Sequence, residues 1–284
     1  MLVWILVVKG NYKTSEKIFL VFSVFLLSYI ISAIMAKPDW HEIGAAITKP
    51  KLQMNENYIA MVIGIIGTTI APWMQFYMQS AVIEKGLRVK HYKFLVADVF
   101  IGSVLTVVVA FFIMVACGAT LNKNGVTIGE AKDAAVALKP FAGALASQVF
   151  AFGLFIASIF SAIILPLATA FYVCEAFGFE AGIDKKLKEA PAFYTLFATI
   201  IIISSGIILV PNVPLIGITI WSQVLNGILL PVVLICMMLI VNNKEIMKKH
   251  VNGKVANIIG WATIVILIAL TLALVLLPAV KAIT

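Results

Sequence analysis

A glycine- and proline-containing stretch within a long apolar run is the part of this sequence best suited to binding an ion. Gly64 and Gly67 weaken a helix, and Pro72 lacks the N–H that the carbonyl of Thr68 would need. In lipid, such carbonyls are tolerated only inside protein or beside a water-filled cavity. The stretch from Thr68 to Trp73 is therefore a candidate ion or substrate site, with a proline kink that binds nothing as the alternative.

Neutral amide side chains follow this stretch and recur in a later apolar run. Gln75 and Gln79 are four residues apart, so they share one face of a helix. Gln223 and Asn226 are three residues apart and share a face of another helix. Buried amides in membrane helices are typical of a polar path, and hydrogen bonding between helices is the alternative explanation.

The predicted site combines metal-ion ligands with a cavity wall. The ligands are backbone or hydroxyl oxygens of the interruption and one amide: Thr68, Thr69, Ala71 and Gln223. The cavity-lining residues are Pro72, Trp73, Gln75, Gln79 and Asn226. These ligands are neutral oxygens, which suit a hard, partly hydrated cation such as Mg²⁺ better than a soft transition metal. We expect the cation to be a substrate, with no resident cofactor and no catalytic residue.

Composition places these residues in a membrane protein. The chain has 284 residues, of which 62% are hydrophobic and 12% charged, whereas soluble domains carry about 25% charged residues. The apolar runs are continuous, unlike the alternating strands of a membrane barrel. The formal charge of +8 lies in short lysine clusters between these runs, which argues against nucleic-acid binding.

Runs of about 20 apolar residues predict an all-α membrane protein with about seven transmembrane helices. We expect a single transmembrane domain over residues 1–284, in which Pro211 and Pro214 separate the fifth and sixth helices. The expected spans are roughly 18–36, 57–83 (broken at 68–73), 95–117, 145–174, 191–210, 216–241 and 256–278.

Loop charges predict an orientation in the cell inner membrane. Loops 9–17, 84–93, 175–190 and 242–255 lie on one side and hold 14 of the 21 basic residues. The positive-inside rule makes this side cytoplasmic. No acidic, basic or histidine side chain stands at mid-depth in any expected span, so the chain supplies no proton relay.

Several motifs resemble the Nramp family of divalent-metal transporters, in the family's order. Residues 67–80, GTTIAPWMQFYMQS, look like family helix 6, and residues 221–227, WSQVLNG, followed by Pro231, resemble helix 10. Supporting stretches are KGNY at 9–12, SEKIFL at 15–20 and PDW at 38–40. The resemblance implies part of a LeuT-like fold, from family helix 4 to helix 11, with the second inverted repeat complete and the first mostly missing.

This sequence departs from the common family pattern at the interruption. Most of the family has Met-Pro-His where Ala71, Pro72 and Trp73 stand here. The resemblance is therefore closest to the Nramp-related magnesium transporter branch, and it puts manganese or iron selectivity and proton symport in doubt. The family's Asp-Pro-Gly motif of helix 1 is absent, so we expect an N-terminally truncated chain.

The sequence thus predicts divalent cation transport, with Mg²⁺ or Mn²⁺ as substrate and without proton coupling. One alternative is a non-transporting truncated remnant or membrane subunit, and another is a proton-coupled Mn²⁺/Fe²⁺ symporter. An intramembrane enzyme is disfavoured because neither HExxH nor GxSxG occurs on any expected span. The expected partners are the divalent ion and the lipid bilayer, with no nucleic acid and with the oligomeric state left open.

Overall fold

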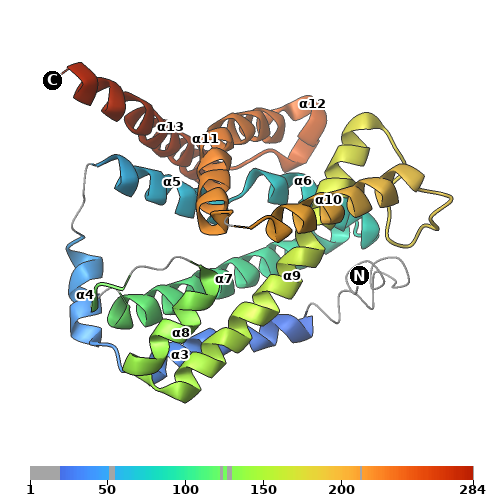
Figure 1. Ribbon diagram of the computed structural model, residues 1–284. Helices are drawn as coiled ribbons and strands as arrows, with labels where there is room; N and C mark the ends of the chain where they lie inside the picture. The colour runs from blue at the N-terminus through green and yellow to red at the C-terminus, as the bar shows by residue number, and fades with distance from the viewer. Residues whose placement is uncertain (1–19, 51–54, 122–123, 127–129, 212, 284) are drawn as a thin grey trace. The chain divides into compact units, whose positions relative to one another are not determined.

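The computed structural model describes residues 20–50, 55–121, 124–126, 130–211 and 213–283. All regular structure in these ranges is helical, and the prediction of an all-α membrane protein is confirmed (Figure 1). The predicted loop 9–17, the motif at 9–12 and all of the motif at 15–20 except Leu20 lie outside the described residues. The α-helices are α3 (Ser28–Met35), α4 (Trp40–Thr48), α5 (Glu56–Thr69), α6 (Pro72–Glu84), α7 (Tyr92–Thr120), α8 (Ala131–Ala142), α9 (Ala144–Phe177), α10 (Pro191–Leu209), α11 (Leu215–Asn242), α12 (Lys244–Met247) and α13 (Lys254–Ile283), with short 3₁₀ turns η1 (Val89–His91) and η3 (Lys248–His250).

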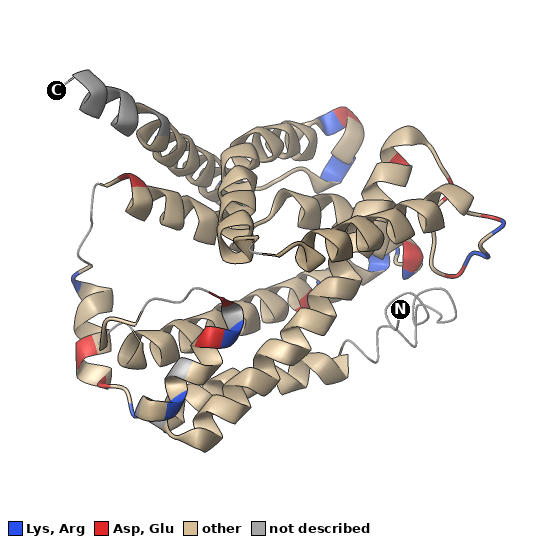
Figure 2. Ribbon diagram, viewed as in Figure 1, with Lys and Arg blue, Asp and Glu red and all other residues tan. Residues whose placement is uncertain are grey.

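Six helical stretches among the described residues are long and apolar enough to cross a membrane. A seventh is obtained when the stretch Leu20–Met35 and α4, which meet at 106°, count as one bent span. Charged side chains gather at helix ends and turns, and long stretches of helix carry none (Figure 2). This distribution is that of a multi-pass membrane protein.

Local sequence signals set several helix boundaries. The Asn55 side chain accepts a hydrogen bond from the Tyr58 N–H at 2.9 Å and caps the start of α5. Asp39 caps α4 in the same way, although the sequence analysis expected no helix there. At its other end, α9 stops at Gly178, whose φ of 72° lies in the left-handed region that glycine adopts without strain.

The chain divides into two compact units, each with its own core. The first unit contains the described residues up to 50 and residues 77–213, and the second contains residues 55–76 and those from 214 onward. The expected single domain over residues 1–284 stays a prediction.

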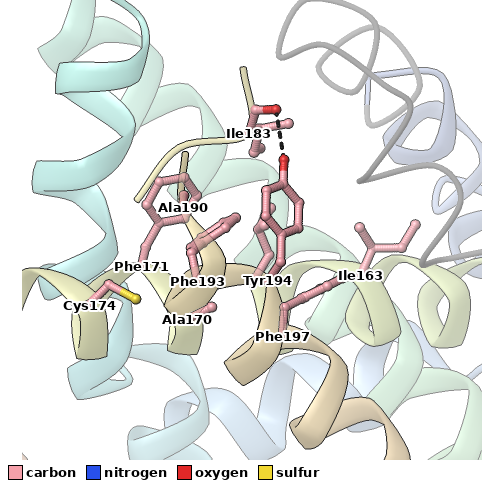
Figure 3. Close-up of a cluster of buried hydrophobic side chains, with 10 residues drawn as sticks. Ile163, Ala170, Phe171, Cys174, Ile183, Ala190, Phe193, Tyr194 and Phe197 are labelled. Carbon is pink, nitrogen blue, oxygen red and sulfur yellow. Dashed lines mark hydrogen bonds between the residues drawn. The ribbon is translucent and has the colours of Figure 1, made fainter. Parts of the chain in front are cut away.

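In the first unit, α9 is the central helix and packs against α3, α8 and α10. One core cluster joins α9 to α10 through buried aromatic rings, with the Phe171 and Phe193 centroids 4.8 Å apart. The Tyr194 hydroxyl donates to the Ile183 carbonyl at 3.3 Å, which ties the α9–α10 loop to this cluster (Figure 3). The second half of α6 packs against the same cluster through Tyr77, whose ring centroid lies 5.9 Å from that of Phe171.

In the second unit, α11 packs along α5 and also against α13. Its buried side chains form two clusters, one where α11 meets α13 and one where α11 meets α5. Val224 belongs to the second of these clusters, together with Ile59 and Ile63 of α5. The α5–α11 pair therefore carries both sequence segments that were expected to form the ion site.

Candidate functional site

The long span formed by α5 and α6 is interrupted near its middle. Two residues, Ile70 and Ala71, separate the two helices, and Ile70 has φ −123° and ψ 59°, outside the helical region. The Ile70 N–H still donates to the carbonyl of Ile66 at 2.9 Å. Pro72 has no N–H for the carbonyl of Thr68. This carbonyl therefore lacks its helical donor near the centre of a 29-residue span.

The backbones of α5 and α11 touch just before this interruption. A Cβ on Gly67 would lie 2.3 Å from the carbonyl oxygen of Gln223 and 2.5 Å from the nitrogen of Gly227. In the other direction, a Cβ on Gly227 would lie 2.5 Å from the carbonyl oxygen of Ile63. These distances leave room only for glycine, which allows membrane helices to approach closely. The crossing places the last turn of α5 directly against the turn of α11 that carries the predicted amides.

The two amides of α11 are joined to each other. The Asn226 Nδ2 donates to the Gln223 Oε1 at 3.1 Å, and both residues are half-buried. An amide oxygen has two lone pairs, so the Gln223 Oε1 keeps one for a further donor or a cation. Asn226 therefore orients the side chain of Gln223.

The predicted backbone and hydroxyl ligands differ in how many hydrogen bonds their oxygens already make. Thr69 donates its hydroxyl proton to the carbonyl of Ile65 at 2.8 Å, which leaves the oxygen's lone pairs available. The Ala71 carbonyl accepts the N–H of Met74 at 3.1 Å and keeps one lone pair. Thr68 is exposed, whereas Ala71 is buried. Of the Thr68 and Ala71 carbonyls, that of Thr68, which lacks its helical donor, is therefore the less engaged.

Gln75 carries a buried side-chain oxygen, Oε1, that has no hydrogen-bond donor among the described residues. A buried acceptor without a donor costs about 1–3 kcal/mol, and a water molecule or a cation bound there would remove this cost. From the sequence, Gln75 was expected to line the cavity. That its oxygen has no donor follows from the side-chain conformation, which residue type and spacing do not give. Pro72 is buried and Trp73 half-buried, as neighbours on the first turn of α6.

Gln79 differs from the other predicted site residues. It is exposed and belongs to the first unit, whereas the other eight belong to the second unit. Ser80, the next residue, is 1% exposed and its hydroxyl has no hydrogen-bond partner among the described residues. The sequence placed Ser80 in the polar stretch after Gln75 and Gln79, but its spacing did not mark it as a site residue.

The chemistry available at the interruption is that of neutral oxygen donors. In the part of the chain that the structure describes, no three His, Cys, Asp or Glu side chains gather where they could hold a metal ion. Carbonyl, amide and hydroxyl oxygens of the second unit remain as donors. Such oxygens bind hard cations such as Mg²⁺ and Ca²⁺.

Comparison with known proteins identifies the family. The model of the family "Natural resistance-associated macrophage protein-like" (Nramp) matches residues 1–277. The chain belongs to the Nramp family. The resemblance noted in the sequence is thus confirmed at the family level, and the assignment to its magnesium branch stays a prediction.

Curated relatives of this Nramp-family chain are named divalent metal cation transporter MntH. The relative from Clostridium acetobutylicum is 26% identical over 258 residues, which cover 88% of this chain and 57% of that protein. The relative from Yersinia pestis is 25% identical over 255 residues, with 86% and 57% covered. The one from Caldanaerobacter subterraneus is 26% identical over 250 residues, with 86% and 56% covered. The chain therefore spans a little over half the length of these relatives.

Proposed function

We propose that this chain takes part in transporting divalent metal cations across the cell inner membrane, and that it is not an enzyme. The observation that carries the proposal is the interruption between α5 and α6, where oxygens lie beside the amide-bearing turn of α11. The oxygens of Thr68 and Thr69, with the remaining lone pair of Ala71, would bind the cation together with Gln223. The names of the curated relatives support a divalent metal as substrate.

The donor types favour Mg²⁺, with Mn²⁺ second, as the transported ion. Mg²⁺ usually keeps several of its waters when it is bound, so a few neutral oxygens can complete its coordination. Position 71 carries alanine, so it supplies no sulfur donor to the interruption. The absence of acidic, basic and histidine side chains at mid-depth in the expected spans favours transport without proton coupling.

We further propose an orientation in which loops 9–17, 84–93, 175–190 and 242–255 face the cytoplasm. The excess of lysine in these loops supports it. A second candidate function is that of a membrane subunit that does not transport by itself, and the uptake experiment below distinguishes it from the first.

Ion uptake into proteoliposomes tests the proposal. The purified chain is reconstituted with a Mg²⁺-sensitive dye in one set of vesicles and a pH-sensitive dye in another. We expect saturable uptake of Mg²⁺ and Mn²⁺ with no change in internal pH. Uptake accompanied by acidification would indicate the proton-coupled symporter instead. Vesicles no more permeable than protein-free ones would indicate the non-transporting subunit.

A further inference from the structure

The turn between α11 and α13 exposes a cluster of basic side chains. The cluster, here called the basic turn, comprises Lys244, Lys248, Lys249, His250 and Lys254, all exposed. Glu245 is the one acidic residue between Asn242 and Lys254. No salt bridge among the described residues involves this turn. Figure 2 shows its blue segments around α12 with a single red one beside them.

Three asparagines hold the two ends of this turn together. Asn242 and Asn257 exchange amide hydrogen bonds, Nδ2 to Oδ1 in both directions, at 2.9 and 2.8 Å. Asn252 adds a bond from its Nδ2 to the Asn257 Oδ1 at 3.3 Å and one from its N–H to the Val241 carbonyl at 3.3 Å. The lysines therefore project from a closed hairpin end.

The two helices that the turn connects place it at a membrane surface. Both α11 and the stretch Lys254–Leu274 are membrane spans, so the residues between them must lie at the level of the lipid headgroups. Apolar side chains flank the lysines there, with Ile246 59% and Val255 71% exposed. Cationic side chains beside exposed apolar ones are typical of segments that contact anionic lipid.

The α9–α10 turn shows that high lysine content does not by itself produce such a surface. It carries Lys185, Lys186 and Lys188, but also the acidic residues Glu180, Asp184 and Glu189. Lys185 forms a salt bridge with Glu180, and Glu189 accepts the backbone N–H of Lys186 at 2.8 Å. Its positive charge is therefore balanced within the turn, unlike that of the basic turn.

We propose that the basic turn binds the phosphate groups of anionic phospholipids in the adjacent leaflet. Its lysines, which form no salt bridge with a described residue, supply the positive charge. The asparagine hydrogen bonds keep the turn closed, and the two adjoining membrane spans place it at the level of the lipid headgroups. This inference does not depend on the proposed transport activity.

Native mass spectrometry of the full chain in detergent tests this proposal. Short-chain phosphatidylglycerol or phosphatidylcholine is added to the native chain, to the variant K244Q/K248Q/K249Q/K254Q and to the control K186Q/K188Q. We expect the native chain and the control to retain phosphatidylglycerol at least about fivefold more than phosphatidylcholine, the factor that one lysine near an anionic surface supplies. The quadruple variant should lose this preference.

Two outcomes would overturn the assignment. In one, the quadruple variant, shown to be folded by circular dichroism, keeps the native preference. In the other, inorganic phosphate at the same concentration displaces phosphatidylglycerol completely, which would identify free phosphate rather than lipid as the ligand.

Discussion

Single oxygen atoms decide what the interruption can bind. The carbonyl of Thr68 loses its helical donor because residue 72 is proline, and the Oε1 of Gln75 is buried without any donor among the described residues. Each such acceptor would destabilise the protein unless something else satisfied it. In the proposed site, a cation with its remaining waters would satisfy both acceptors.

Replacing Gln75 by leucine tests this role at the atom in question. Leucine keeps much of the volume and removes the unpartnered oxygen, so we expect the thermal stability without ion to be unchanged or higher. If Gln75 binds the ion or its water, the KM for Mg²⁺ uptake should rise about tenfold, equivalent to about 1.4 kcal/mol. The matched control is Gln148→Leu, at an exposed glutamine of α9. An unchanged KM in the Gln75 variant would remove this residue from the site.

Gln223 gives a second prediction for a single residue. The change Gln223→Ala deletes the predicted amide ligand and leaves Asn226 without its acceptor. We expect Mg²⁺ uptake to fall at least about tenfold at low ion concentration, as for the loss of one contact of about 1.4 kcal/mol. Uptake by Gln148→Ala should equal that of the native chain. Equal losses in both variants would show that Gln223 has no special role.

The sequence predicted which residues surround the interruption, but not how far each oxygen was already used. Proline and glycine act through the backbone alone, so their effect can be derived from position. The contact of Ala71 with Met74 and the unpartnered state of Gln75 depend on a local turn and a side-chain conformation. Neither follows from residue type and spacing.

Among the helices, the α5–α11 crossing brings together the two segments of the proposed site. Gly67 and Gly227 allow backbone contact between segments about 160 residues apart in the chain. From the sequence, Gly67 was expected to weaken its helix, and Gly227 was part of the motif at 221–227. Their partners could not be predicted, because long-range pairing leaves no trace in the spacing of a single sequence.

Adding one methyl group at this crossing should disturb it measurably. Gly67→Ala and Gly227→Ala each insert a Cβ about 2.5 Å or less from backbone atoms of the facing helix. We expect each to destabilise the protein by about 1–3 kcal/mol, the usual cost of overpacking, and to reduce Mg²⁺ uptake. The control is Gly102→Ala in α7, where no atom lies within 4 Å of the added Cβ. Native-like melting temperatures for all three variants would contradict the crossing.

Short helices were harder to predict than long ones. The α4 helix follows Pro38 and Asp39, a recognisable helix start, but its nine residues are too few to register as an apolar run. The long apolar stretches, by contrast, each run for about 20 residues or more, which only a membrane span explains in a chain with 12% charged residues.

For the whole molecule, the lysine distribution predicts which side of the membrane each loop faces. In a chain whose native cysteines Cys117, Cys174 and Cys236 are replaced by serine, we would introduce Lys132→Cys, Lys186→Cys or Lys249→Cys. A membrane-impermeant maleimide should label the Lys132 variant in intact cells. The other two variants should be labelled only after the membrane is opened. The reverse labelling pattern would show that the chain has the opposite orientation in the membrane.

Equilibrium binding of Mg²⁺ to the purified chain tests the central claim most directly, because it requires no transport. Calorimetric titration of the native chain should show saturable binding, and the variant Gln75→Leu/Gln223→Ala should bind at least about tenfold more weakly with an unchanged melting temperature. Binding that is equally strong in the double variant would contradict the claim that oxygens at the α5–α6 interruption and on α11 hold the ion.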